Sequence, residues 1–185
     1  GFRSFGQRLA ALEAPTLTEV KAASEAPKHH IVDTVEKLES FITLLKTQTL
    51  ISVDTETTDV DPRRAEIVGY AIALTPGEGY YIPVMAPPGE TALPPHLVAD
   101  SLRPILENPG IAKVGQNLKY DYVALGGAGI KLAGITFDTM IASYLVDANR
   151  SSQAPEPLAL ERLGYTALTV GEVRGKGVKA ISMPE

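Results

Sequence analysis

Two carboxylates stand one residue apart where an apolar segment of the chain becomes polar. Asp54 and Glu56 belong to the stretch ISVDTETTDVDP, residues 51–62. On a β-strand, side chains two positions apart share a face, so these two acids would project together and Thr55 would point the other way. Close carboxylates repel unless a cation offsets their charge, and their oxygens suit hard divalent ions. The spacing predicts half of a divalent-metal site, although acids also occur at strand ends simply for solubility.

A third carboxylate, Asp121, lies in the stretch VGQNLKYD, residues 114–121. The helical pattern begins after Asn117, a residue type that favours helix N-caps, so Asp121 falls in the first turn of a helix. An acid in that turn complements the helix dipole without needing any further role. Asp121 therefore indicates a catalytic site only in combination with Asp54 and Glu56.

The composition narrows the class of protein. The chain has 185 residues, of which 44% are hydrophobic and 21% charged, as is typical of one globular domain. The absence of cysteine excludes disulfides, thiolate catalysis and cysteine-based zinc sites. A net charge of −5 argues against broad coating of duplex nucleic acid but permits an enzyme that grips one strand end. No apolar run or leader segment suggests a membrane, so a cytoplasmic location is expected.

Strand and helix patterns alternate along the chain and predict an α/β fold. A helix is expected over residues 2–12, followed by a polar linker, and the second region is expected to begin at residue 29. Strands are predicted at 49–54, 65–74, 79–84 and 111–115, and helices at 95–108, 117–127, 138–146 and 157–164.

Local signals add detail to this plan. The segment 30–47 should start as a short strand and continue as a helix capped by Asp33, with Glu36 completing a capping box. The turn TPGEG, residues 75–79, should join two strands as a hairpin. Asp138 is the expected N-cap of the helix that follows it. The result would be a mixed central sheet with an antiparallel edge, flanked by helices.

Together these motifs resemble a known family. VDTETTDVD, KVGQNLKYDYVAL and GITFDTMIASYLV, in this order, are similar to the 3′–5′ exonuclease (proofreading) domain of bacterial DNA polymerase I, within the ribonuclease-H-like DnaQ exonuclease superfamily. The resemblance covers residues 29–185, and residues 1–28 resemble the segment that follows the 5′ nuclease domain. It implies a ribonuclease-H-like exonuclease fold with the acids at the centre of a mixed sheet.

The resemblance also implies a chemistry. In this family two divalent ions, Mg²⁺ or Mn²⁺ with Zn²⁺ as a further candidate, act on the terminal phosphodiester of a single-stranded DNA 3′ end. One ion assists formation of the attacking hydroxide, and the other stabilises the leaving 3′ oxygen. On the matching positions, Asp54 would bridge both ions, Glu56 would hold the nucleophile-side ion, and Asp121 would hold the second ion through water. The polymerase domain of the same parent chain is the implied partner.

Five further residues match family positions along the path of the DNA strand end. The resemblance assigns to Thr55 a backbone contact near the terminal nucleotide and to Val60 the position of an apolar wedge between the last bases. Gln116, Asn117 and Tyr120 would supply contacts to sugar, phosphate and bases. Valine is small for a wedge, which predicts weaker stacking than in relatives with a larger side chain.

Other acids have simpler roles or are missing. Asp59 and Asp61 match no catalytic position and are interpreted as turn residues. The family's fourth carboxylate belongs to a Tyr-x-x-x-Asp motif, and the nearest pair here, Tyr144 and Asp147, has the wrong spacing. That motif is expected just beyond Glu185, so residues 1–185 alone are expected to bind metal poorly and to degrade DNA slowly or not at all.

Two alternatives remain open at this level. The chain could be a catalytically silent relative that serves a polymerase as scaffold or strand-end binding module, although the presence of all three acids argues against this. It could also be an RNA exonuclease of the ribonuclease D type.

Overall fold

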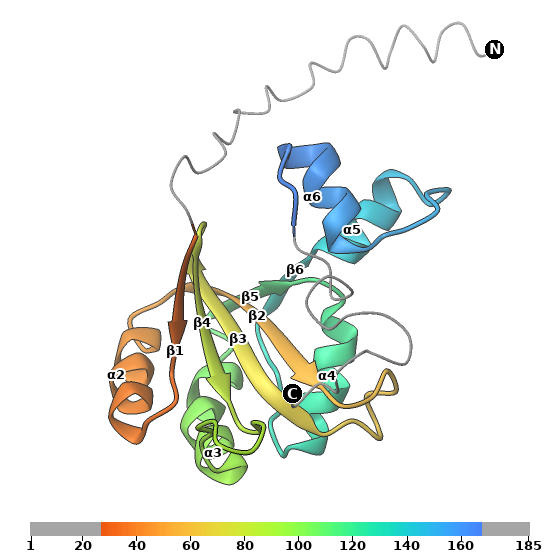
Figure 1. Ribbon diagram of the computed structural model, residues 1–185. Coiled ribbons are helices and arrows are strands. Elements are labelled where there is room, and N and C mark those ends of the chain that lie inside the picture. Colours follow the sequence, from red (N-terminus) through yellow and green to blue (C-terminus); the bar gives the residue numbers. More distant parts are fainter. Residues whose placement is uncertain (1–26, 168–185) are drawn as a thin grey trace, which may run out of the picture.

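The computed structural model describes residues 27–167, which form a six-stranded sheet with helices (Figure 1). The strands are β1 (Lys28–Ile31), β2 (Leu50–Thr57), β3 (Ile67–Thr75), β4 (Glu78–Pro83), β5 (Ala112–Gly115) and β6 (Ile135–Asp138). The helices are α2 (Val35–Leu45), α3 (Pro95–Leu106), α4 (Leu118–Gly127), α5 (Thr139–Val146) and α6 (Pro155–Leu163). The predicted α/β fold with a mixed central sheet is confirmed.

The strands follow the spatial order β1-β4-β3-β2-β5-β6, so β2 is central in the sheet. β2 pairs antiparallel with β3 and parallel with β5, and β4 pairs antiparallel with β3 and parallel with β1. The β3–β4 hairpin is confirmed, but its expected place at the edge is wrong. β1 pairs in parallel with β4 on its outer side, so the one antiparallel strand, β3, is interior.

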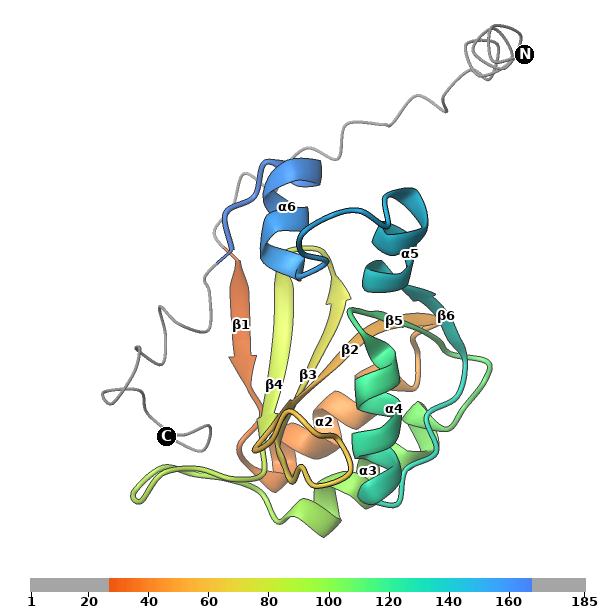
Figure 2. The same ribbon diagram turned by 90° about the vertical axis from the view of Figure 1, so that its right-hand side faces the viewer.

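One face of the sheet carries the hydrophobic core. On β2, Ile51 and Val53 are buried and lie in the same core cluster as Leu38 of α2, Leu102 of α3 and Leu125 of α4. Figure 2 shows these three helices together in the lower half of the view, whereas α5 and α6 lie at the opposite end of the molecule, with α5 next to β6. Since strand side chains alternate between faces, the acids of β2 are on the face opposite to this core.

The predicted cap of α2 differs from the structure in detail. Thr34, not Asp33, is the N-cap of α2, and its hydroxyl accepts from the backbone N–H of Lys37 at 3.3 Å. The helix therefore begins one residue later than expected, and Glu36 does not occupy the capping-box position. Asp33 instead receives a bond from the Lys37 ammonium at 2.6 Å.

Several predictions concern residues outside the described range. These are the helix expected over residues 2–12 and the linker after it. The domain boundary near residue 28 depends on them, so all three remain predictions. Within residues 27–167, no helix is long and apolar enough to span a membrane.

Candidate active site

Asp54 and Glu56 lie next to each other on the exposed face of β2. Their partners across the β2–β3 pair are Ala71 and Gly69, and the Tyr81 side chain lies over Gly69, with its hydroxyl 2.2 Å from where a Cβ atom of residue 69 would stand. Although Asp54 has exposed surface, desolvation by the surrounding protein and then the charge of Glu56 raise its pKa to about 6. The face of β2 that carries these two carboxylates is therefore a candidate cation-binding site.

Asp121 reaches the same strand from helix α4. Its carboxylate oxygen Oδ1 accepts two hydrogen bonds from Thr55, one from the backbone N–H at 2.8 Å and one from the hydroxyl at 2.7 Å. Asp121 is 2% exposed, and desolvation raises its pKa to about 6; the Thr55 hydroxyl opposes this shift and the charge of Asp54 adds to it. The structure therefore brings Asp121 within electrostatic reach of Asp54.

The end of strand β5 explains how α4 comes so close to β2. The β2–β5 pairing ends at Ser52 and Val114, and the chain then turns into α4 through Gly115. A Cβ atom on Gly115 would lie 2.7 Å from the carbonyl oxygen of Val53, so only glycine permits this approach. Asp121 consequently accepts the N–H of Thr55 beyond the point where β5 stops pairing with β2.

Asp138 fixes the position of α4, a role that the sequence did not reveal. Its buried carboxylate accepts backbone N–H bonds from Asn117 at 3.1 Å and Leu118 at 2.7 Å, at the start of α4. It also caps its own helix, α5, through the N–H groups of Met140 and Ile141. One carboxylate therefore satisfies N-terminal donors of two helices. The α5 cap was predicted, but the second helix meets it only in the folded chain.

Asn117 occupies the predicted N-cap position of α4 but does not cap it with its side chain. Its φ of 60° places it in the left-handed region, whereas a capping residue is normally extended. The side-chain oxygen of Asn117 instead accepts a bond from Lys119. Asp138 supplies the capping acceptor in its place.

The remaining predicted contact residues lie around the end of β2. Val60 is 93% exposed in the loop after β2. The Tyr120 hydroxyl bonds to that loop and to Thr57, at 2.5 Å from the threonine hydroxyl. Thr55 uses its N–H for Asp121, so that group is already occupied. The contacts assigned to these residues remain predictions.

Comparison with known proteins decides the family. A profile of the 3′–5′ exonuclease family matches residues 29–182, which is most of the chain. The chain belongs to the 3′–5′ exonuclease family. It is 35% identical over 153 residues to DNA polymerase I of Pseudomonas aeruginosa, covering 80% of this chain but only 16% of that polymerase. The expected relationship to the exonuclease region of bacterial DNA polymerase I is thereby confirmed.

Solved structures support the fold of this exonuclease domain. Ribonuclease D of Trypanosoma brucei, in complex with GMP, superposes with a TM-score of 0.62 at 21% identity, covering 75% of this chain and 42% of that chain. NrnC of Brucella melitensis with bound Mg²⁺ superposes with a TM-score of 0.58 at 18% identity, covering 78% of this chain and 65% of that one. At these identities the likeness concerns the fold.

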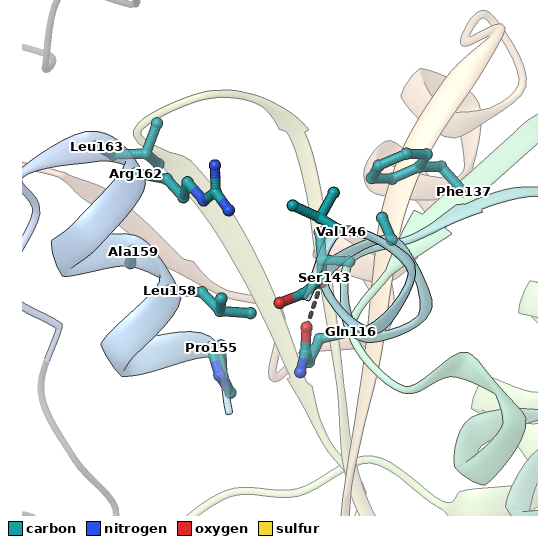
Figure 3. A pocket seen from close by; sticks show the side chains of 11 residues that line it. Gln116, Phe137, Ser143, Val146, Pro155, Leu158, Ala159, Arg162 and Leu163 are labelled. Atoms are coloured by element: carbon teal, nitrogen blue, oxygen red, sulfur yellow. Dashed lines mark hydrogen bonds between the residues drawn. The ribbon is translucent and has the colours of Figure 1, made fainter. Parts of the chain in front are cut away.

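The exonuclease domain has an apolar cavity of about 420 Å³ between α5 and α6, and Gln116 lines it (Figure 3). The Gln116 amide donates to the carbonyl of Gln153 at 2.7 Å and accepts from the Thr139 hydroxyl. Its polar atoms are thus engaged by the α5–α6 region. The amide has a second N–H and a second lone pair, so these two bonds do not exclude the predicted contact between Gln116 and DNA.

The donor set of the exonuclease domain suits a divalent ion but is incomplete. Within residues 27–167, no three histidine, cysteine or acidic side chains form a metal-binding group. Asp54 and Asp121 have raised pKa values and take part in no ion pair with a described cation. Each carboxylate is destabilised first by desolvation and then by a nearby carboxylate, Glu56 for Asp54 and Asp54 for Asp121. A divalent ion such as Mg²⁺ or Mn²⁺ would offset this charge.

Proposed function

We propose that this domain removes nucleotides from single-stranded DNA 3′ ends, as the proofreading part of a DNA polymerase I. The observation that carries the proposal is the convergence of Asp121 on the strand that bears Asp54 and Glu56. An acid from a helix is bonded to the residue between two acids of a strand, 66 positions earlier in the sequence. A single function that needs three acids explains this arrangement better than three separate structural roles.

Asp54, Glu56 and Asp121 would hold two divalent ions, Mg²⁺ or Mn²⁺. When bound, these ions supply Lewis-acid stabilisation of the charge that develops at the scissile phosphate. Thr55 keeps one oxygen of Asp121 fixed, which leaves the other oxygen as the candidate ligand atom. The raised pKa of Asp54 means that its carboxylate binds a proton below about pH 6, so cation binding should weaken there.

The role of the domain in a larger protein is part of the proposal. The chain spans 16% and 17% of the lengths of two related bacterial polymerases, from Pseudomonas aeruginosa and Chloroflexus aurantiacus. A polymerase domain in the same parent chain would supply the frayed 3′ end. The 185 residues contain no Tyr-x-x-x-Asp motif, so we expect this chain alone to act slowly or not at all.

Digestion assays test the proposal and its alternatives. The substrates are single-stranded DNA and RNA oligonucleotides of the same sequence, labelled at the 5′ end, with Mg²⁺ or Mn²⁺. The full-length protein should shorten the DNA from its 3′ end, and the Asp54→Ala variant should not. Preference for RNA would instead favour a ribonuclease D-like activity. Absence of both digestion and Mn²⁺ binding in the full-length protein would favour a silent scaffold.

A further inference from the structure

The loop between β2 and β3, residues 58–66, is closed and internally braced. Thr58 and Glu66 exchange two bonds of 3.0 Å at its base. Inside the loop, Asp59 accepts from the N–H of Asp61 at 2.9 Å, and Asp61 accepts from the N–H of Arg63 at 3.1 Å. These bonds are turns of the Asx type, as predicted for Asp59 and Asp61. They shape the loop but do not attach it to the rest of the domain.

Tyr120 attaches the loop to helix α4. Its hydroxyl bonds to the carbonyl oxygen of Asp59 and to the hydroxyl of Thr57. Because a carbonyl can only accept, the phenol proton goes to Asp59. The Thr57 hydroxyl donates to the phenol oxygen and, at 3.3 Å, to the same Asp59 carbonyl. The three oxygens thus join the end of β2, the loop and α4 at one point.

This junction is next to two residues of the candidate site. Asp59 directly precedes Val60, whose 93% exposed side chain has too little packing to hold its own position. Tyr120 directly precedes Asp121 on α4, so one helical turn carries both the loop anchor and a candidate catalytic acid. The Tyr120 hydroxyl is therefore the link between the Val60 loop and the helix that carries Asp121, and the Thr57 hydroxyl links the same loop to β2.

We propose that Tyr120 is a positioning residue that sets the place of Val60 relative to the acids and thereby the selectivity for unpaired 3′ ends. The inference rests on the proposed function, because selectivity needs a nucleic-acid substrate. It differs from a direct DNA contact by the Tyr120 ring, since the hydroxyl is used within the protein. At the family position assigned to Val60, an apolar wedge would separate the last bases, so its place relative to the acids would decide whether a paired end can reach them.

Hydrogen exchange of backbone amides tests the anchoring without any nuclease activity. In the 185-residue chain, Tyr120→Phe should raise exchange across residues 58–66 by about three- to tenfold, the equilibrium effect of one hydrogen bond. Thr57→Val should do the same, and serves if Tyr120→Phe does not fold. The matched control is Tyr122→Phe on the same helix, since Tyr122 is 54% exposed and forms no hydrogen bond with a described residue. Unchanged exchange in folded Tyr120→Phe and Thr57→Val would overturn the anchoring.

Digestion by the full-length protein tests the consequence. The measurement is the ratio of initial rates on an unpaired and a paired 3′ end. Tyr120→Phe and Val60→Ala should each lower this ratio by about three- to tenfold, and the double variant should lower it no further, because both changes remove the same restraint. An unchanged ratio in Tyr120→Phe, or fully additive losses, would overturn the positioning role. If the wild type digests nothing, the proposed function fails, whereas the exchange result still decides whether Tyr120 anchors the loop.

Discussion

Thr55 donates two hydrogen bonds to a single oxygen of Asp121. The backbone nitrogen of Thr55 lies 2.8 Å and its hydroxyl oxygen 2.7 Å from Oδ1 of Asp121. The two residues come from the central strand and from the helix beside it, and both are buried. Since the N–H bond is made by the backbone, any residue except proline at position 55 could provide it. The hydroxyl bond depends on the side chain and can be removed by itself.

Thr55→Val should destabilise the domain by about 1 kcal/mol, because it removes one buried bond to a carboxylate and keeps the side-chain volume. Thr55→Ser retains the hydroxyl and should cost less. Urea unfolding of the three proteins followed by circular dichroism gives the comparison. Equal stability of the valine variant and the wild type would show that the hydroxyl bond contributes nothing.

Asp138→Ala should be more damaging, with a loss of about 2–4 kcal/mol, because the carboxylate accepts four backbone N–H bonds from the starts of two helices. Asp147→Ala is the matched control, since this exposed aspartate follows α5 and its carboxylate accepts one backbone N–H, from Asn149. The midpoints of urea unfolding should separate the two variants clearly. Similar losses in both would contradict the double cap.

The metal-free domain should become less stable as pH rises from about 4 to 6. Asp121 has a pKa of about 6 in the folded chain against an ordinary 3.8, so the folded state binds the extra proton in this window. Asp121→Asn mimics the protonated form and should gain about 2 kcal/mol relative to the wild type across the same window. Unfolding in urea at several pH values, with a chelator present, measures the difference. A constant difference between the two proteins would contradict the raised pKa.

Lys113 should impose a pH dependence in the alkaline range. This lysine is fully buried on β5, donates to the carbonyl of Asn108 at 2.6 Å, and has a pKa lowered by desolvation from 10.5 to about 8. The unfolded chain binds more protons between these values, so stability should rise with pH from about 8 to 10. Lys113→Met should abolish that rise, and Lys131→Met, at an exposed position, should retain it. The measurement is the free energy of unfolding of the wild type and of both variants at pH 8, 9 and 10.

The sequence predicts the parts of the site that depend on local periodicity. The pairing of Asp54 and Glu56 on one face follows from strand geometry, and the position of Asp121 in the first turn of α4 follows from the helical pattern. The turn roles of Asp59 and Asp61 also follow from short-range chemistry. In each case the relevant neighbours lie within a few residues along the chain.

The features that the sequence missed depend on contacts between distant segments. Burial of Lys113 requires an acceptor from the loop after α3, and the second cap by Asp138 requires α4 to start beside α5. The hydrogen bond from the Gln116 amide to the Gln153 carbonyl depends on the position of the segment between α5 and α6. The edge position expected for the hairpin was wrong because strand order is decided by where β1 joins the sheet. None of these relationships leaves a periodic signal.

Release of the 3′-terminal nucleotide from single-stranded DNA by the full-length protein is the most direct measurement of the central claim. With Mg²⁺ or Mn²⁺, the wild type should release nucleotides, and Asp121→Ala should lower the rate by at least about 100-fold, since loss of an ion ligand removes several kcal/mol of transition-state stabilisation. Wild-type rates in a folded Asp121→Ala variant would contradict the claim that these three acids form one active site.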